Sequence, residues 1–513
     1  MNKLSAVSAE TIRHTLCHGW RGYALALVAG SLVTLSLAPF NIWPLGIISL
    51  ALLAMLLDRG SPALAAKTGW FYGLGLFGSG VSWVFVSIHD YGYAPVPLAA
   101  LLTLIFCAGL ALLSAATAYG YTRWLRAGPL GNTAGFAAAV VLGEWLRSWL
   151  LTGFPWLYLG YGHIDTVLAG WAPVGGVWAI SFIVAYSGAA ATAALLGRCQ
   201  RWGQLAAVLG LWLGGAALNQ HQWVNAVDRA PLKVAMIQAN ISQHEKWSPS
   251  AYSRTLATYR DMSAPLWHSH DIVIWPEGAV PNYYQNAKGF LDTIAEQAQN
   301  EQSTLITGIP SRRQDPTSPV AKSYNSIMAF GAGSGTYHKQ RLVPFGEYIP
   351  LEGLLRGLIQ FFDMPMSAFS PGSSEQSPLT AGDITLAPFI CYEIVYPELV
   401  SSWLPAADLL ITISNDAWFG HSIGPLQHLE MAQMRALEAG RYLLRSTGSG
   451  VSAIIDQRGR IVTQSQQFTT EVLKGQARIY SGTTPIAAQG TWPVILWCLV
   501  ICLALRLRTW ARQ

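Results

Sequence analysis

The stretch Ile384–Glu393, which reads Ile-Thr-Leu-Ala-Pro-Phe-Ile-Cys-Tyr-Glu, decides how the central part of the chain is interpreted. Its mostly apolar part predicts a buried strand that ends on Cys391, where polar groups follow at once. A thiol at the end of a core strand is held by rigid backbone, which suits a nucleophile. Free cysteine is also among the most buried residue types, so a small core residue is the alternative. The rest of the chain decides between them.

The positions of the cysteines favour a free thiol at that point. The chain has six cysteines: Cys17, Cys107, Cys199, Cys391, Cys498 and Cys502. Only Cys391 lies in the central region, so neither a disulfide framework nor a C-x-x-C zinc spacing is available there. We therefore expect a reactive thiol without a metal.

Composition separates this central region from its flanks. The hydrophobic fraction is 52% and only 12% of the 513 residues are charged, which is too apolar for an ordinary soluble enzyme. Residues 221–488 carry 19 Lys and Arg against 22 Asp and Glu, whereas the flanks carry 13 against 5. The net charge of +5 belongs to the apolar flanks and marks membrane topology rather than binding to nucleic acid.

The flanks predict a helical membrane domain. Each apolar run approaches or exceeds the roughly 20 residues that cross a bilayer. The predicted spans are 22–39, 43–57, 69–88, 97–120, 134–152, 172–196, 203–219 and 491–506. This gives a membrane domain over residues 1–219 with seven transmembrane helices, a central domain over 220–488, and an eighth helix with a tail over 489–513.

Short loops predict the orientation of these spans. Lys and Arg recur in alternate loops and after the last span, which places both termini in the cytoplasm and residues 220–488 on the other side. Arg147, near the end of the fifth span, departs from this pattern. Glu144 lies three residues earlier on the same helix face. Charges inside a membrane are costly and often functional, but a structural pair is equally compatible with this spacing.

The central region alternates short apolar strands with helices, which predicts a layered α/β domain. The predicted strands are Leu232–Gln238, Asp271–Trp275, Ser303–Ile309, Tyr324–Phe330, Ile384–Ile390, Leu409–Ser414 and a hairpin over Ser452–Ile461. The predicted helices are 250–266, 286–300 and 425–444.

Three polar residues follow the ends of predicted strands. Glu277 follows Trp-Pro, Lys339 precedes Gln-Arg-Leu-Val-Pro-Phe-Gly-Glu, and Cys391 ends its strand. A cysteine nucleophile needs a base, which a partly desolvated carboxylate supplies. A tetrahedral intermediate needs donors at its oxyanion, which Lys339 and the backbone N–H of Tyr392 supply. Each motif alone is weak, since a glutamate after a strand is usually a solvated loop residue.

Together these motifs resemble the nitrilase, or carbon–nitrogen hydrolase, superfamily. With eight predicted spans, the whole chain is similar to its membrane-embedded branch, the apolipoprotein N-acyltransferase family. The motifs that carry this resemblance are Trp-Pro-Glu-Gly, Lys-x-Arg-Leu-Val-Pro-Phe-Gly-Glu-Tyr-Ile-Pro, Cys-Tyr-Glu and Ser-Asn-Asp-Ala-Trp-Phe. The resemblance implies a multi-span α-helical membrane domain plus an α/β domain with the α-β-β-α sandwich of the nitrilases.

The resemblance also assigns roles. Glu277 matches the general base, Lys339 the lysine that stabilises the intermediate, and Cys391 the nucleophile. Supporting positions of the site are matched by Glu347, Tyr392 and Glu393. Substrate-binding positions are matched by Trp247, Trp418 and Phe419.

Plainer interpretations stand beside some of these roles. Glu347 is also explained as a structural ion-pair partner of Lys339. Trp247 is equally explained as packing against lipid. We interpret His428 as structural. The apolar segment 353–369 is either a membrane-dipping lid or a packed loop.

The implied reaction moves an acyl chain from a phospholipid to an apolipoprotein, without a metal or other cofactor. Cys391 takes the chain as a thioester, with the sn-1 chain of phosphatidylethanolamine as the expected donor. The N-terminal amine of a diacylglyceryl-cysteine then takes it as an amide, which completes lipoprotein maturation. The implied location is the bacterial inner membrane, with the catalytic domain in the periplasm. The alternatives are a membrane-tethered amidase or nitrilase, and a membrane scaffold with an inactive nitrilase-like domain.

Overall fold

The computed structural model describes residues 19–198, 200–314, 321–349, 368–404 and 406–510. The chain divides into two compact units. The helical unit consists of Met1–Phe85, Val96–His221 and Thr491–Gln513, and the α/β unit consists of Val86–Pro95 and Gln222–Gly490. Most of the predicted segment 353–369 lies outside the described residues.

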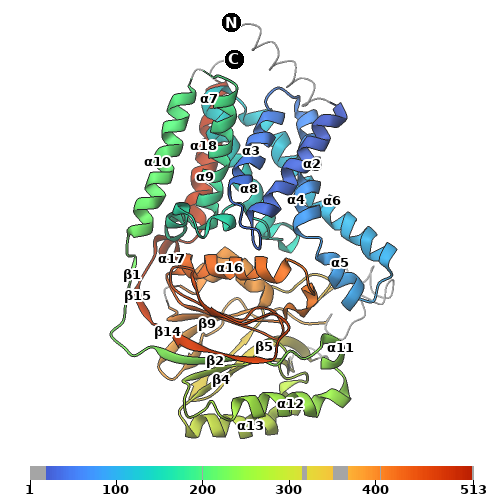
Figure 1. Ribbon diagram of the computed structural model, residues 1–513, viewed down its shortest axis with the longest axis vertical. Coiled ribbons are helices and arrows are strands. Elements are labelled where there is room, and N and C mark those ends of the chain that lie inside the picture. Colours follow the sequence, from blue (N-terminus) through green and yellow to red (C-terminus); the bar gives the residue numbers. More distant parts are fainter. Residues whose placement is uncertain (1–18, 199, 315–320, 350–367, 405, 511–513) are drawn as a thin grey trace. The chain divides into compact units, whose positions relative to one another are not determined.

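The described part of the α/β unit contains two large β-sheets (Figure 1). The first has the strand order β14-β2-β3-β4-β5-β7, and the second has the order β13-β12-β11-β10-β9-β8-β6. The strands of the first sheet are β2 (Leu232–Gln238), β3 (Ile272–Ile274), β4 (Thr304–Arg313), β5 (Lys322–Gly331), β7 (Thr336–His338) and β14 (Glu471–Ala477). Those of the second are β6 (Gly333–Ser334), β8 (Leu379–Ala381), β9 (Ile384–Ile390), β10 (Leu409–Ser414), β11 (Leu443–Thr447), β12 (Ala453–Ile455) and β13 (Ile461–Gln464).

These two sheets pack face to face, because side chains alternate between the two sides of each strand. In β2, Val234 and Met236 belong to the core that both sheets share, whereas Ala235 and Ile237 belong to a second core. The helices outside the sheets are α12 (Pro249–Ser263), α13 (Tyr284–Asn300), α15 (Pro397–Ser402) and α16 (Gly424–Ala439). α12 and α13 close the second core, and α16 contacts the other sheet at β11 (Figure 1). This is the predicted α-β-β-α sandwich.

Several strands were predictable to the residue, because β2, β9 and β10 have the predicted bounds. The prediction of one helix over 425–444 is wrong at its end, because α16 stops at Ala439 and Leu443–Thr447 forms β11. Gly440 has a φ of +62° and ends α16 in the left-handed conformation that glycine favours. Strand β14 was not predicted, since most of its side chains are at least partly exposed and few are apolar.

The described helical unit contains eight helices of 13 to 25 residues. They are α2 (Gly19–Ser36), α3 (Pro44–Leu56), α4 (Pro62–Gly80), α6 (Val96–Gly120), α8 (Phe136–Trp149), α9 (Ala172–Leu195), α10 (Arg201–Gln220) and α18 (Trp492–Trp510). Small residues bring some of them together. A side chain at Gly75 of α4 would collide with the backbone of Leu27 in α2, and one at Gly69 with the backbone of Ser114 in α6. Close packing on glycine is typical of helices in membranes.

Among the described residues, the stretches Val96–Leu125, Gly131–Thr152 and Val167–Leu195 are long and apolar enough to cross a membrane. A fourth stretch qualifies only if α4 and Val84–Tyr91 together form one span, and the two segments are bent by 61° relative to each other. The third predicted span is displaced, because α4 begins earlier than 69 and ends at Gly80. The hydroxyl of Ser61 caps α4, and Pro62 suits its first turn. The total of eight spans stays a prediction.

Candidate active site

Three strand ends of the α/β unit deliver the three candidate catalytic side chains. β3 ends at Ile274 and leads through Trp275 and Pro276 to Glu277. β7 ends directly before Lys339, and β9 ends directly before Cys391. Because strands are the most rigid part of the sandwich, side chains at their ends are held in fixed places.

Lys339 is the centre of a buried charge cluster. Its Nζ lies 2.8 Å from Oε2 and 2.9 Å from Oε1 of Glu347, and 3.8 Å from Oε1 of Glu277. Only 1% of Lys339 is exposed. Burial by itself would lower the pKa of the ammonium, but the two carboxylates outweigh it and raise that pKa. Lys339 is therefore a permanent cation beside two carboxylates.

Asn325, in the middle of β5, completes this cluster. Its Nδ2 donates to Oε1 of Glu277 and to Oε1 of Glu347, both at 2.7 Å. The sequence analysis did not single out Asn325, although a polar residue inside a predicted buried strand is a usable signal. The second oxygen of Glu277 accepts from the backbone N–H of Asn415 at 2.8 Å. Each carboxylate is therefore held in one orientation by short hydrogen bonds.

Lys246 is a second buried lysine near this cluster that the sequence analysis did not identify. Its Nζ donates to the backbone carbonyl of Glu277 at 3.0 Å, and 4% of the residue is exposed. Burial lowers the pKa of Lys246 to about 8, although Glu277 raises it. Lys246 thus fixes the backbone that carries Glu277.

Cys391 occupies a sharp turn where β9 passes into a short 3-10 helix, Cys391–Val395. Its φ of +53° is rare for a residue with a side chain. Burial and the charge of Glu277 raise the pKa of the Cys391 thiol to about 12, although Lys339 lowers it. The resting group is therefore a neutral thiol that needs a base when it reacts.

Glu393 connects the turn of Cys391 to the segment of Lys339. Its Oε1 accepts from the hydroxyl of Tyr337 at 2.8 Å and from the N–H groups of Gln340 at 2.6 Å and Arg341 at 3.1 Å. Its Oε2 accepts from the N–H of Ile390 at 2.8 Å. Burial raises the pKa of Glu393 to about 7 against Lys339 and these donors. Glu393 is buried and fixes residues on either side of Lys339 and the residue before Cys391.

Comparison with known proteins accounts for both units. Residues 29–190 match the apolipoprotein N-acyltransferase N-terminal domain, and residues 233–479 match the carbon-nitrogen hydrolase family. An apolipoprotein N-acyltransferase of Pseudomonas syringae pv. tomato is 48% identical over 94% of this chain and 96% of its own. The chain belongs to the apolipoprotein N-acyltransferase family.

More distant proteins extend this comparison. The apolipoprotein N-acyltransferase of Vibrio parahaemolyticus is 39% identical over 96% of this chain and 98% of its own. A solved carbon-nitrogen hydrolase from Helicobacter pylori G27 is 16% identical, with a TM-score of 0.36, over 48% of this chain and 89% of its own.

The three aromatic residues that the family resemblance suggested for substrate binding lie in different surroundings. A side chain at Gly278 would lie 3.7 Å from the ring of Trp247, so Trp247 borders the segment of Glu277. The backbone carbonyl of Trp418 accepts from the hydroxyl of Ser87 at 2.8 Å. Phe419 is 8% exposed and faces the ring of His428, which makes it a packing residue here.

Tyr392 is 8% exposed and its ring lies edge-on to that of Tyr396, with the ring centres 5.3 Å apart. Its side chain therefore packs beside the turn, and the expected contribution of its N–H to an oxyanion stays a prediction. In the described part of the chain, no three His, Cys, Asp or Glu side chains lie together so as to hold a metal ion.

Glu144 and Arg147 lie on α8 and are buried within the helical unit. Oε1 of Glu144 accepts from the N–H of Leu159 at 2.9 Å. The guanidinium of Arg147 lies over the rings of Phe77 and Tyr158, at 5.1 and 5.2 Å from their centres. These contacts, a backbone hydrogen bond and two cation–π interactions, are those of structural residues.

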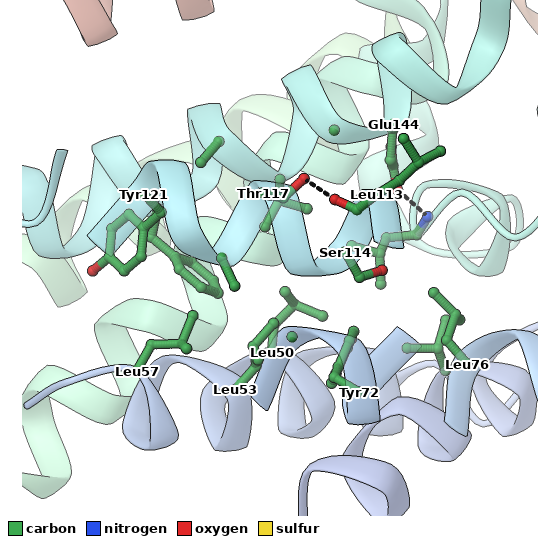
Figure 2. Close-up of a pocket in the computed structure, with 18 of the residues that line it drawn as sticks. Leu50, Leu53, Leu57, Tyr72, Leu76, Leu113, Ser114, Thr117, Tyr121 and Glu144 are labelled. Carbon is green, nitrogen blue, oxygen red and sulfur yellow. Dashed lines mark hydrogen bonds between the residues drawn. The ribbon is translucent and has the colours of Figure 1, made fainter. Parts of the chain in front are cut away.

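The same two side chains line a pocket in this unit. Figure 2 shows Glu144 at one end and Tyr121 at the other, with Leu50, Leu53 and Leu57 among the apolar residues along it. The cavity has a volume of about 80 Å³. A buried water needs roughly 10–15 Å³, and a cavity of roughly 150 Å³ admits benzene. By this measure the pocket is about half the size of a cavity that admits benzene.

Proposed function

We propose that this protein transfers an acyl chain from a phospholipid, through a thioester on Cys391, to the N-terminal amine of a diacylglyceryl-cysteine in an apolipoprotein. The observation that carries the proposal is the fixed cluster of Glu277, Lys339, Glu347 and Asn325, which acts on the thiol of Cys391 in a chain of this family. The names of the relatives support acylation of lipoproteins. The phospholipid donor, expected to be the sn-1 chain of phosphatidylethanolamine, is part of the proposal.

In the first half-reaction, the sulfur of Cys391 attacks the ester carbonyl while Glu277 takes the proton of the thiol. The negative charge that develops on the carbonyl oxygen meets the ammonium of Lys339. This ammonium has three N–H donors, and the two oxygens of Glu347 engage two of them. The third N–H is available to the oxyanion. The intermediate then expels the lysophospholipid alkoxide, which takes the proton back from Glu277.

In the second half-reaction, the free amine of the lipoprotein attacks the thioester. Glu277 now takes a proton from the amine, and the tetrahedral intermediate expels the sulfur of Cys391. The sulfur regains a proton from Glu277, so that both charge and protons balance over the cycle. Lipid substrates exclude water from the thioester, which protects it from hydrolysis.

We place the chain in the inner membrane of a bacterium, with the α/β unit in the periplasm. The support is the concentration of Lys and Arg in alternate short loops and after the last apolar segment. Both proposed substrates are anchored in the bilayer, so an enzyme built into the membrane meets them without extracting them.

The test is the intact mass of the full-length protein after incubation with phosphatidylethanolamine and no acceptor. We expect a mass gain of one acyl chain, located on Cys391 by peptide mapping and removed when a diacylated lipopeptide is added. Cys391→Ala should show no gain. Cys502→Ala, which removes another partly buried cysteine, should gain mass like the wild type.

An adduct that persists in Cys391→Ala would overturn the assignment of the nucleophile. Turnover of a small amide without any lipid adduct would favour a membrane-tethered amidase. Neither activity in a folded protein would favour a scaffold with an inactive domain.

A further inference from the structure

His428, which the sequence analysis interpreted as structural, contacts the nucleophile's own backbone. It lies on α16 and is 1% exposed. Its Nε2 lies 3.1 Å from the carbonyl oxygen of Cys391. Its Nδ1 lies 3.3 Å from Oδ1 of Asp416 and 3.2 Å from Nη2 of Arg445. A chain of buried polar groups therefore ends on the turn that carries the thiol.

The carbonyl of Cys391 defines the state of one ring nitrogen of His428. A carbonyl oxygen only accepts, so Nε2 must carry the hydrogen that binds Cys391. Nδ1 lies between Oδ1 of Asp416, which accepts, and Nη2 of Arg445, which donates. Burial, and then the charge of Arg445, lower the pKa of His428, whereas Asp416 and the carbonyl of Cys391 raise it.

Asp416 and Arg445 anchor this ring. Nη2 of Arg445 donates to Oδ2 of Asp416 at 2.6 Å, and Nε of Arg445 donates to the carbonyl of Val451 at 3.2 Å. Oδ1 of Asp416 accepts from the hydroxyl of Ser414 at 2.6 Å. The charges of Asp416 and Arg445 balance each other, and neither residue is more than 2% exposed. Such a fully buried pair fixes the geometry of what it contacts.

The segment that contains Asp416 also contacts Glu277, the proposed general base. Asn415, next to Asp416 in the chain, donates its backbone N–H to Oε2 of Glu277 at 2.8 Å. The same short segment thus holds Glu277 directly and Cys391 through His428. A residue at a φ of +53° keeps that strained conformation only when its surroundings fix it.

We propose that His428 is a positioning residue, which holds the carbonyl of Cys391 so that the thiol stays aligned with Glu277 and Lys339. The role rests on the proposed function, because it matters only if Cys391 is the nucleophile. His428 touches no reacting atom. Loss of its hydrogen bond lets the turn of Cys391 relax, and small displacements of reacting groups cost up to about 10²-fold in rate.

The test compares His428→Leu with His428→Gln in the full-length protein. Leucine fills the space without a donor, whereas the amide nitrogen of glutamine can occupy the place of Nε2. The measurement is the single-turnover rate at which phosphatidylethanolamine acylates Cys391, followed by intact mass, together with the melting temperature. We expect His428→Leu to lower this rate by tenfold to about 10²-fold and His428→Gln to restore most of it.

Gln433→Ala is the matched control on the same helix. It removes the 2.9 Å hydrogen bond from Nε2 of Gln433 to the carbonyl of Gly459, and it should leave the acylation rate unchanged. A folded His428→Leu that acylates at the wild-type rate would overturn the proposal. A folded His428→Gln that is as slow as His428→Leu would also overturn it. If His428→Leu does not fold, a folded His428→Gln whose acylation rate falls by tenfold or more would overturn it.

If the proposed function is wrong, the result is distinguishable, because the wild-type protein itself would form no acyl adduct on Cys391. In that case the rate of alkylation of Cys391 by iodoacetamide replaces the acylation rate, with the same comparison of variants and the same outcomes.

Discussion

Two buried cations, Lys339 in the α/β unit and Arg147 in the helical unit, have different surroundings. Lys339 in the α/β unit contacts both oxygens of Glu347, and Asn325 joins Glu347 to Glu277. Arg147 in the helical unit has a 3.5 Å contact to the carbonyl of Leu157 and lies over two rings. Its Nε has no hydrogen-bond partner among the described residues.

The difference indicates which of these charges is arranged for chemistry. A buried charge is costly unless partners compensate it, and partners that do so also fix it in place. The positive charge of Lys339 is balanced by the carboxylates of Glu347 and Glu277, and the charge of Glu277 also acts on the thiol of Cys391. Arg147 interacts with the charge of the buried Glu144, but it lies over two rings and makes one weak backbone hydrogen bond, as suits a residue that packs.

The largest effect is expected for Lys339→Met. Removal of the cation leaves the carboxylates of Glu347 and Glu277 buried without their counter-charge, which costs roughly 3–5 kcal/mol of unfolding free energy. It also removes the proposed oxyanion donor, so acyl transfer should be lost. Thermal or denaturant unfolding measures the first effect, and acylation of Cys391 measures the second.

Lys288→Met is its control. Lys288 pairs with Asp292 on the surface of α13, and the same substitution there should change neither stability nor acylation measurably. If Lys339→Met were as stable and as active as Lys288→Met, the buried cluster would not be the compensated site that we describe.

Glu277→Gln should have two effects that are measured separately, one on acyl transfer and one on the pKa of the Cys391 thiol. Acyl transfer should fall by roughly 10²–10⁴-fold, because glutamine cannot take the proton of the thiol. The carboxylate of Glu277 raises the pKa of Cys391, so its removal should lower that pKa. The pH at which iodoacetamide alkylates Cys391 half-maximally should therefore be lower in Glu277→Gln than in the wild type.

Glu296→Gln, at an exposed position of α13, should leave both activity and the alkylation profile unchanged. An upward shift of the alkylation profile in Glu277→Gln would show that the charge of Glu277 does not act on the thiol as the geometry requires.

Asn325→Leu should have a smaller effect. It removes a donor shared by two buried carboxylates, which costs about 1–3 kcal/mol for the groups left unsatisfied. Glu277 and Glu347 then lose their common orientation, and we expect acyl transfer to fall by roughly 10–10²-fold.

Asn286→Leu, which removes a hydrogen bond between Asn286 and Asn282 on the surface, serves as the control and should behave as the wild type. Full activity in a folded Asn325→Leu would mean that Lys339 and the backbone donors, such as the N–H of Asn415, orient both carboxylates without Asn325.

Much of the fold and of the candidate site was predictable from the sequence. The residues that were missed share one cause. Strong apolar runs fixed β9 and β10, because buried strands leave little choice of residue. The strand-end motifs predicted Glu277, Lys339 and Cys391 as one set. Asn325 was missed because its role depends on which carboxylates the fold brings beside β5, and no local pattern contains that information.

His428 was underestimated for a similar reason. Its spacing on α16 is that of any buried helix residue, and only the fold brings Cys391 to its Nε2. The end of α16 was also misplaced, because the apolar residues of β11 continue the apolar character of the helix beyond Gly440.

The smallest effect is expected for Arg147→Gln in the helical unit. It removes the contacts with Phe77 and Tyr158, and we expect a loss of about 1 kcal/mol of stability. The rate at which Cys391 is acylated should stay within about threefold of the wild type, which corresponds to less than 1 kcal/mol in the barrier. Arg123→Gln, at an exposed position of the same unit, controls for loss of a positive charge. A fall in acylation comparable to that of Lys339→Met, in a folded Arg147→Gln, would contradict the contrast. It would mean that a cation held by two rings and a weak backbone contact takes part in the reaction.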